Sequence, residues 1–364
     1  MTKKCNRAFV LGAGFSKAAG MPLSTELTAK LVREARLGSR GEHGRYLRNL
    51  MRSIGKISGG PTGLNVEQLF DYAKLDAEMR KMAQQRCPVG RRYGCTPYNK
   101  AEMIEGLLRK LHDSLVRVIL KEQKRAAIRR IQQFTRHLHP GDGIITFNYD
   151  TLVERCLDSH QVSWHHGLDD QKEDPYRVVV LKMHGSIDWI VAPRNQKMPK
   201  TFNLLFSKTD ENARRGRQVP PEEIEYHCQL WRVPFDHVGP LDEMCHGLST
   251  FELWQGVAGL GSFKPLHQLP GSGLTWARAR GALSEAEEIY VIGFSMSPFD
   301  GMACLAFLEA IKRRTPRRRN PKRVCLIDPH ADELAERYLG VFGPSLTLIK
   351  KGAQDVDWST LLKE

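Results

Sequence analysis

The stretch AFVLGAGFSKAAGMP, residues 8–22, joins a short apolar run directly to a turn that contains Gly12 and Gly14. Ala8 to Leu11 is apolar like a buried strand, and apolar residues at helical spacing predict a helix from about Ser24. Glycine allows close backbone approach, and the free N–H groups that begin a helix bind phosphate well. The stretch therefore predicts a strand, a turn and a helix, with the turn suited to a phosphate group.

The turn does not identify the phosphate by itself. Lys17 occupies the position where a dinucleotide fingerprint has its third glycine. The Gly-Lys-Ser/Thr sequence that defines a P-loop is absent from the turn, which disfavours a kinase or ATPase. A strand followed by Gly-x-Gly is equally typical of a plain tight turn. The assignment therefore depends on the rest of the chain.

Length and composition predict an ordinary globular protein. The chain has 364 residues, of which 41% are hydrophobic and 26% charged, so it fits one large domain with insertions or two domains. It has no apolar run of about 18 residues and no signal-peptide core near its start, so we expect a cytoplasmic protein that makes no membrane contact. Its eight cysteines are scattered, which predicts reduced thiols and no metal.

Charge leaves the class of partner open. Lysine and arginine number 55 against 41 acidic residues, giving a net charge of +14. A basic surface attracts any polyanion, and it attracts anionic cofactors equally well. A nucleic-acid partner is therefore possible, although a solvated face or an oligomer contact explains the same charge more simply.

Strands that alternate with helices predict an α/β fold, namely a Rossmann-like parallel sheet with helices on both faces and a mainly helical insertion. We expect a Rossmann-like domain formed by 1–37, 141–190 and 271–364, a helical insertion at 38–140, and an irregular insertion or small subdomain at 191–270. Within these parts, we expect a loop at 38–63 and one long helix at 100–138. Strands are expected at 8–11, 144–147, 178–183, 289–292, 324–327 and 345–349.

Polar side chains follow the expected strands at their carboxyl ends: Asn148, Asp150, His184, Ser295, Asp300 and Asp328. The carboxyl ends of parallel strands share one edge of a sheet, and ligands bind there. Gly12 and Gly14 fall at the same edge. The sequence therefore predicts that five segments converge on one crevice.

Three of these polar residues suit chemistry on a sugar. The amide of Asn148 both donates and accepts hydrogen bonds, which suits holding a water or sugar hydroxyls. His184 has the residue type most common for a general base near neutral pH. Asp150 suits the same site, but it also stands where it would cap a helix from Thr151. Both roles of Asp150 stay open.

Four ordered motifs carry a family resemblance: GAGFSKAAGMP from Gly12, ITFNYDTLVE from Ile145, KMHGSIDW from Lys182 and IYVIGFSMSPFD from Ile289. Together they resemble the NAD-binding signature of the sirtuins. They are most similar to bacterial sirtuin-like proteins of antiphage defence, many of which hydrolyse NAD. The resemblance covers about half of the chain, and it leaves most of 38–140 and 190–270 without specific motifs.

The resemblance implies a role for each polar group. The pyrophosphate of NAD would be wrapped by Gly12, Ala13, Gly14, Phe15 and Ser16. Asn148 would orient a water and the nicotinamide ribose, and Asp150 would lie near the nicotinamide carboxamide. His184 would act as a base or as a hydroxyl partner at that ribose.

The remaining residues of the site are implied at the other end of the ligand. Gly293, Ser295 and Asp328 would lie near the adenosine, and Asp300 would contact a ribose. NAD is then the substrate, and no metal is expected. The implied reaction converts NAD and water to ADP-ribose and nicotinamide through an oxocarbenium-like state.

Such an activity needs control, because an unregulated enzyme would deplete the NAD of its own cell. The resemblance therefore implies an enzyme that depletes NAD in abortive infection once it is activated. We expect a homo-oligomer, and a partner ATPase or translocase or a phage-derived trigger. The contact surface is expected within 38–140 or 191–270.

Departures from the deacylating sirtuins disfavour protein deacylation. The Phe-Arg pair that usually follows their glycine loop is missing from 21–25, and Phe147 replaces their glutamine. Their two Cys-x-x-Cys pairs are absent too. Zinc spacing is lacking both for Cys87 with Cys95 and for His227-Cys228 with Cys245-His246. The alternatives kept are an NAD-dependent deacylase and a non-catalytic regulator that binds NAD or ADP-ribose together with nucleic acid.

Overall fold

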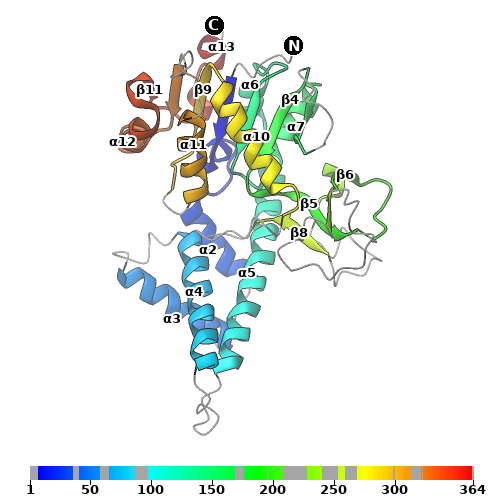
Figure 1. The fold of residues 1–364 in the computed structure, drawn as a ribbon, viewed down its shortest axis with the longest axis vertical. Helices are drawn as coiled ribbons and strands as arrows, with labels where there is room; N and C mark the ends of the chain where they lie inside the picture. Colours follow the sequence, from blue (N-terminus) through cyan, green and yellow to red (C-terminus); the bar gives the residue numbers. More distant parts are fainter. Residues whose placement is uncertain are drawn as a thin grey trace. The chain divides into compact units, whose positions relative to one another are not determined.

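The computed structural model describes residues 7–35, 41–57, 65–86, 97–168, 176–194, 196–207, 228–239, 253–258, 269–297, 300–312, 321 and 323–362. The chain forms two compact units (Figure 1). We call the first the sheet unit, Met1–Met21, Ile119–Ala258 and Pro265–Glu364, and the second the helical unit, Pro22–Val118 and Gly259–Lys264. The division into domains expected from the sequence stays a prediction.

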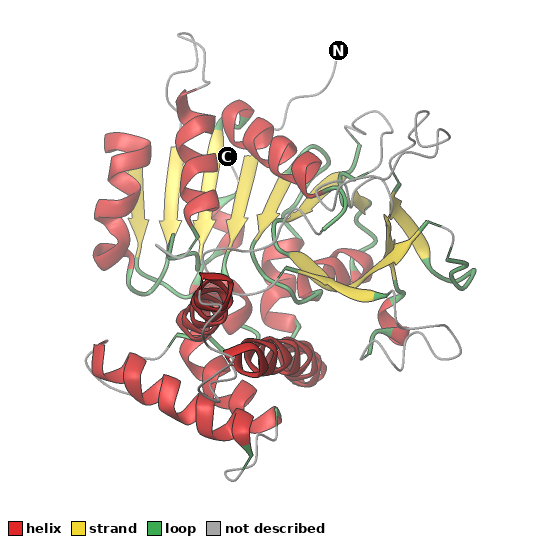
Figure 2. Cartoon of the chain, turned by 60° about the horizontal axis from the view of Figure 1, so that its bottom comes forward, coloured by secondary structure: helices red, strands yellow, loops and turns green. Residues whose placement is uncertain are grey.

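A seven-stranded sheet forms the centre of the sheet unit, and all of its strand pairs are parallel. Figure 2 shows its strands pointing the same way. In spatial order the strands are β11 (Leu346–Ile349), β10 (Arg323–Ile327), β9 (Glu288–Ile292), β1 (Arg7–Leu11), β2 (Gly143–Thr146), β4 (Val178–Lys182) and β3 (Trp164–His165). The α/β fold with a parallel sheet is confirmed.

The strand order places a topological switch point between β1 and β9. From β1 the chain builds the sheet outward on one side through β2, β3 and β4, and it then returns to the other side of β1 with β9. Leu11 pairs with both Thr146 and Ile292, and Thr146 pairs with Lys182, so these strands end at one level. The segments that follow them meet at the edge where open parallel sheets bind ligands.

Helices cover both faces of the sheet, as the sequence predicts. Ala8 and Val10 pack into a core with side chains of α10 (Ser272–Glu285), α11 (Gly301–Lys312) and α12 (Ala331–Phe342). Phe9 points to the other face, where its ring lies 5.1 Å from that of Tyr290 and 5.2 Å from that of Phe134 in α6 (Arg129–Thr135). Burial on both faces explains why these strands are continuous apolar runs rather than alternating ones.

The segment 191–270, expected as an irregular insertion or a small subdomain, contains strands of a second, antiparallel sheet. Its order is β6 (Asn203–Phe206), β7 (Cys228–Arg232), β5 (Gly185–Pro193) and β8 (Trp254–Val257). The first eight residues of β5 are buried, so the strand lacks the alternation that marks a half-buried strand. Cys228 is buried in β7. The other residues considered for zinc, Cys87, Cys95, His227, Cys245 and His246, lie outside the described residues.

The helical unit contains α2 (Ser24–Glu34), α3 (Glu42–Ile57), α4 (Val66–Arg86) and most of α5 (Pro97–Arg125). The loop expected at 38–63 is therefore wrong. Leu47 and Ile54 lie two helical turns apart in α3 and are 2% and 1% exposed. Their burial stabilises this helix, although the composition of 38–63 is typical of a loop.

The single long helix expected at 100–138 is also wrong, because α5 ends at Arg125 and α6 begins at Arg129. The N–H of Ala127 donates to the carbonyl of Ala19 at 2.8 Å instead of to a helical carbonyl. This tertiary hydrogen bond interrupts the helix. The remaining short elements of the described residues are α1 (Ala13–Lys17), α7 (Leu152–Ser159), α13 (Trp358–Leu361) and three 3-10 helices, η5 (Phe235–His237), η9 (Gly343–Ser345) and η10 (Ala353–Asp355).

Candidate functional site

Three glycines bring the turns after β1 and β9 into backbone contact. Gly12 N donates to Ile292 O at 3.1 Å, and Gly14 N donates to Gly293 O at 2.9 Å. A Cβ on Gly12 would lie 2.5 Å from Gly293 O, and one on Gly14 would lie 2.7 Å from Gly293 Cα. Gly293 itself has φ +59°, and a Cβ there would overlap the backbone of Gly14 and Phe15. We call Gly12, Gly14 and Gly293 the glycine crossing.

The glycine crossing changes the meaning of the glycine-rich turn. The close approach that the sequence suggests is made by the chain's own backbone. The N–H groups of Gly14 and Phe15 donate to Gly293 O and Gly12 O, at 2.9 and 3.0 Å. The glycines are thus required by the fold, and their contact with a pyrophosphate stays a prediction.

A relay of side-chain hydrogen bonds joins this turn to the segment after β2. Asn148 Nδ2 donates to Gly12 O at 2.8 Å and to Ser16 Oγ at 2.9 Å. Ser16 Oγ in turn donates to Asp150 Oδ2 at 2.8 Å. A carbonyl only accepts, so the nitrogen of Asn148 must face Gly12. Oδ1 of Asn148 accepts no hydrogen bond from the described part of the chain, so it can accept one from a hydroxyl or water.

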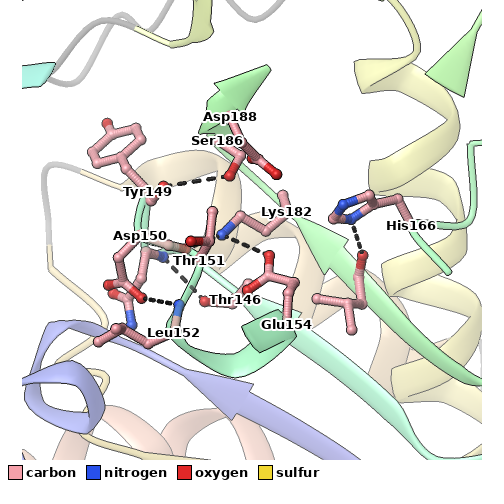
Figure 3. Close-up of polar contacts among 12 residues, drawn as sticks. Thr146, Tyr149, Asp150, Thr151, Leu152, Glu154, His166, Lys182, Ser186 and Asp188 are labelled. Atoms are coloured by element: carbon pink, nitrogen blue, oxygen red, sulfur yellow. Dashed lines mark hydrogen bonds and ion pairs between the residues drawn. The ribbon is translucent and has the colours of Figure 1, made fainter. Parts of the chain in front are cut away.

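Asp150 bonds both to the start of α7 and to the relay, and its contact with a ligand stays a prediction. Its Oδ1 accepts from Leu152 N at 3.2 Å (Figure 3), and its Oδ2 accepts from Ser16 Oγ. The residue is 6% exposed. Its carboxylate therefore accepts the first N–H of α7, whose N-cap residue is Thr151, and also binds Ser16, and both contacts hold the turn in place.

His184 lies between β4 and β5 beside a second acid. Its Nε2 is 3.4 Å from Asp300 Oδ2, and the two side chains are 5% and 7% exposed. The distance suits an ion pair, and among the residues that the structure describes Nε2 has no hydrogen-bond partner. The ring of Phe147 meets the imidazole edge-on at 5.2 Å. An acid this close to the imidazole can interact with it electrostatically.

The residues implied at the adenosine end are anchored to α12. Arg337 Nη1 donates to Ser295 O at 3.0 Å, and Tyr338 Oη donates to Phe294 O. Asp328 Oδ1 accepts from His330 N at 2.8 Å, just before α12. The structure thus joins Gly12, Ser16, Asn148 and Asp150 in one network and pairs His184 with Asp300. A hydrogen bond joins Ser295 to α12, and Asp328 lies just before the start of that helix.

Sequence reasoning missed a buried ionic cluster near this edge, formed by Lys182, Glu154, Asp188 and Arg232. Figure 3 shows Lys182, Glu154 and Asp188 of this cluster. Lys182 Nζ donates to the carbonyl of Asp150 and lies 3.1 Å from Glu154 Oε1. Arg232 Nε donates to Asp188 Oδ2 at 3.0 Å. Burial raises the pKa of Glu154. The charge of Lys182 lowers this pKa, and the charge of Asp188 raises it further. A lysine that ends the apolar run VVVLK is the signal that could have revealed this cluster.

Comparison with known proteins supports the sirtuin-like resemblance for one segment. The model of the SIR2-like domain matches residues 142–215, which include Asn148, Asp150 and His184. No curated protein matches the chain. One similar solved structure is a mutant Sir2 homologue in complex with ADP-ribose, with 15% sequence identity and a TM-score of 0.37, covering 98% of this chain and 90% of that one.

None of the helices in the described ranges has the length and apolar character needed to cross a membrane. Among the same residues, no group of three or more His, Cys, Asp or Glu side chains is placed to hold a metal ion.

Proposed function

We propose that this protein binds NAD at the carboxyl edge of its parallel sheet and hydrolyses it to ADP-ribose and nicotinamide. The observation that carries the proposal is the relay from Asn148 through Ser16 to Asp150, which starts at Gly12 beside the switch point. Asn148 and Asp150 lie within the segment that matches the SIR2-like domain. A polar network at a switch point suits a bound nucleotide.

The chemistry that this proposal requires is simple. The bond between C1′ of the ribose and the nicotinamide nitrogen breaks, and its electron pair leaves with nicotinamide, whose positive charge is thereby neutralised. A water oxygen bonds to C1′ through an oxocarbenium-like state. The proton of that water passes to His184 and then to solvent. No acid is needed for the leaving group, so positioning supplies much of the rate enhancement.

The side chains divide this work. Asn148 Oδ1 accepts a hydrogen bond from the water or a ribose hydroxyl, while its nitrogen holds Gly12 and Ser16. His184 accepts the proton, and the Asp300 carboxylate at 3.4 Å stabilises the resulting imidazolium. Asp300 thus has two proposed roles: it stabilises His184, and it makes the ribose contact that the resemblance implies. Contacts of 12–16 with the pyrophosphate, and of Ser295 and Asp328 with the adenosine, belong to the same proposal.

The test is incubation of purified protein with NAD, followed by chromatography of nicotinamide and ADP-ribose. Asn148→Ala and His184→Ala are each expected to lower the rate by about 100-fold or more. His237→Ala is the matched control, because the side chain of His237 is 59% exposed in η5. Urea unfolding of each variant separates loss of chemistry from loss of fold. Equal product from the wild type and both site variants would remove these two roles.

Two other outcomes identify the alternatives. Nicotinamide release that appears only with an acylated lysine peptide would establish a deacylase. Tight NAD binding without turnover, with or without phage lysate, would establish a regulator that uses NAD as a ligand.

The biological setting is a separate proposal that rests on the sequence resemblance. The hydrolase depletes NAD during phage infection, and homo-oligomerisation, a partner ATPase or a phage-derived trigger releases its activity. Cellular NAD measured through infection tests this. A fall is expected with the wild type and not with His184→Ala, and an equal NAD level in both strains would contradict the proposal.

A further inference from the structure

Lys182 is a buried lysine whose two partners belong to a single neighbouring segment. It is the last residue of β4 and is 2% exposed. Its ammonium donates to the backbone carbonyl of Asp150 and lies 3.1 Å from the Glu154 carboxylate in α7. A buried ammonium is costly unless it is both paired and hydrogen bonded. Lys182 therefore binds firmly to the segment 150–154.

This lysine stands two residues before His184, and the segment it binds carries Asp150 of the relay. Figure 3 shows Lys182 reaching from its strand towards both Asp150 and Glu154. Tyr149 adds a second link between the same segments, because its carbonyl accepts from Ile187 N at 3.0 Å. Lys182 thus connects the chain segment of His184 with that of Asn148 and Asp150.

Charge balance does not by itself require the pair of Lys182 and Glu154. Asp188, the other acid of the cluster, is 0% exposed and has its own cation in Arg232 at 3.0 Å. Glu154 and Lys182 form the other pair, so the cluster holds two cations and two anions. An apolar pair of similar volume would fill the same space without any desolvation cost. What an apolar pair cannot supply is the hydrogen bond to the Asp150 carbonyl.

We propose that Lys182, held by Glu154, is a positioning residue of this site: it sets the place of Asn148 and Asp150 relative to His184. The inference rests on the proposed NAD hydrolysis. Lys182 acts through Asp150 and not on substrate, because its side chain is 1% exposed and its ammonium is enclosed by protein.

The test compares two buried ion pairs at opposite ends of the same sheet. Lys182→Met with Glu154→Gln removes both charges of the positioning pair. The control, Arg7→Met with Asp142→Asn, removes the pair at the amino end of β1, where Arg7 Nη2 lies 2.6 Å from Asp142 Oδ2. Amide hydrogen exchange is measured for 149–152 and for β9, together with kcat and KM for NAD.

The positioning role predicts exchange at 149–152 at least tenfold faster in the Lys182 double variant, with β9 unchanged. It also predicts kcat lowered at least tenfold, with a smaller change in KM. The control pair is expected to leave both quantities within threefold of the wild type. Glu154→Gln alone keeps the bond to Asp150 and is expected to retain at least a third of the wild-type kcat.

Three results would overturn the inference: wild-type exchange at 149–152, wild-type kcat in the Lys182 double variant, or an equal loss in the control pair. If that double variant does not fold, Lys182→Gln with Glu154→Gln carries the same comparison, since a side chain one atom shorter weakens the bond to the Asp150 carbonyl without leaving a buried carboxylate unpaired. A wild type that releases no nicotinamide defeats the proposed function. The exchange comparison then still decides whether Lys182 holds the segment.

Discussion

The glycine crossing and the network around Asn148 hold two sides of the same sheet edge by different forces. At the glycine crossing, Gly12 and Gly14 meet Gly293 with backbone atoms alone, so tight packing excludes any side chain. Across the switch point, Asn148 and Asp150 are held by side-chain hydrogen bonds, and a buried ammonium supports them.

This difference decides how each side tolerates change. A clash between a new Cβ and a neighbouring backbone has no partner substitution that relieves it. A buried polar pair, by contrast, can be replaced together, because most of the penalty comes from the partner left behind. We therefore expect almost any substitution at the glycine crossing to destabilise the protein. On the polar side, we expect single substitutions to destabilise the protein more than paired ones.

The largest expected effect is at the glycine crossing. Gly293→Ala places a Cβ on a residue with φ +59° and against the backbone of Gly14 and Phe15. We expect the free energy of unfolding to fall by about 4 kcal/mol or more in urea denaturation. Gly281→Ala in α10 is the control, because nothing lies within 4 Å of its Cβ position. It should gain about 0.5–1 kcal/mol, and similar stability of the two variants would refute the steric explanation.

The next effect is on the polar side. Lys182→Met alone leaves Glu154 buried without its cation and the Asp150 carbonyl without its donor. We expect a loss of about 3 kcal/mol of unfolding free energy. The addition of Glu154→Gln should recover at least half of that loss in the same urea experiment. A double variant as unstable as the single one would show that the polar side tolerates paired substitution no better than the glycine crossing does.

A smaller effect is expected where the two sides meet. Ser16→Ala removes the hydroxyl that accepts from Asn148 and donates to Asp150, both within 2.9 Å. The buried groups left without partners should lower the free energy of unfolding by about 2 kcal/mol, measured by thermal or urea unfolding. Ser114→Ala is the matched control, since among the described residues that buried hydroxyl bonds the carbonyl of Lys110 in its own helix. A loss as large at Ser114 would mean that the relay contributes nothing special.

The smallest effect is a pH dependence at His166, which packs near the polar side. Burial, followed by the charges of Arg232 and Lys182, lowers the pKa of His166 well below 6.5. Below pH 6.5 the unfolded chain binds a proton that the folded protein refuses, so stability is lost as pH falls, by up to about 1.4 kcal/mol per pH unit. Stability above that pH is unaffected by this group.

Urea unfolding at pH 7.0 and 5.5 measures the contribution. His166→Asn, which retains a donor for the Val180 carbonyl, should lose about 1 kcal/mol less than the wild type between these two pH values. The exposed His237→Ala should lose as much as the wild type. Equal losses in the wild type and His166→Asn would show that His166 does not govern this acid response.

Much of the parallel sheet was predictable from the sequence. Strands such as β1 and β9 are short apolar runs bounded by glycine, because both of their faces are buried. The second sheet was not predictable, since β5 is almost fully buried and shows no alternation. The end of α5 was also hidden, because it depends on the hydrogen bond from Ala127 to Ala19, which local pattern does not encode.

The site divides in the same way. The sequence by itself determined which residues stand at the carboxyl edge, since a polar residue after an apolar strand is a local signal and parallel strands end together. Only the tertiary structure decided which of them meet. Gly12 faces Gly293 and Asn148, and Lys182 faces Asp150, across separations of 32 to 281 residues. Such contacts depend on strand order and packing, which no single stretch of chain contains.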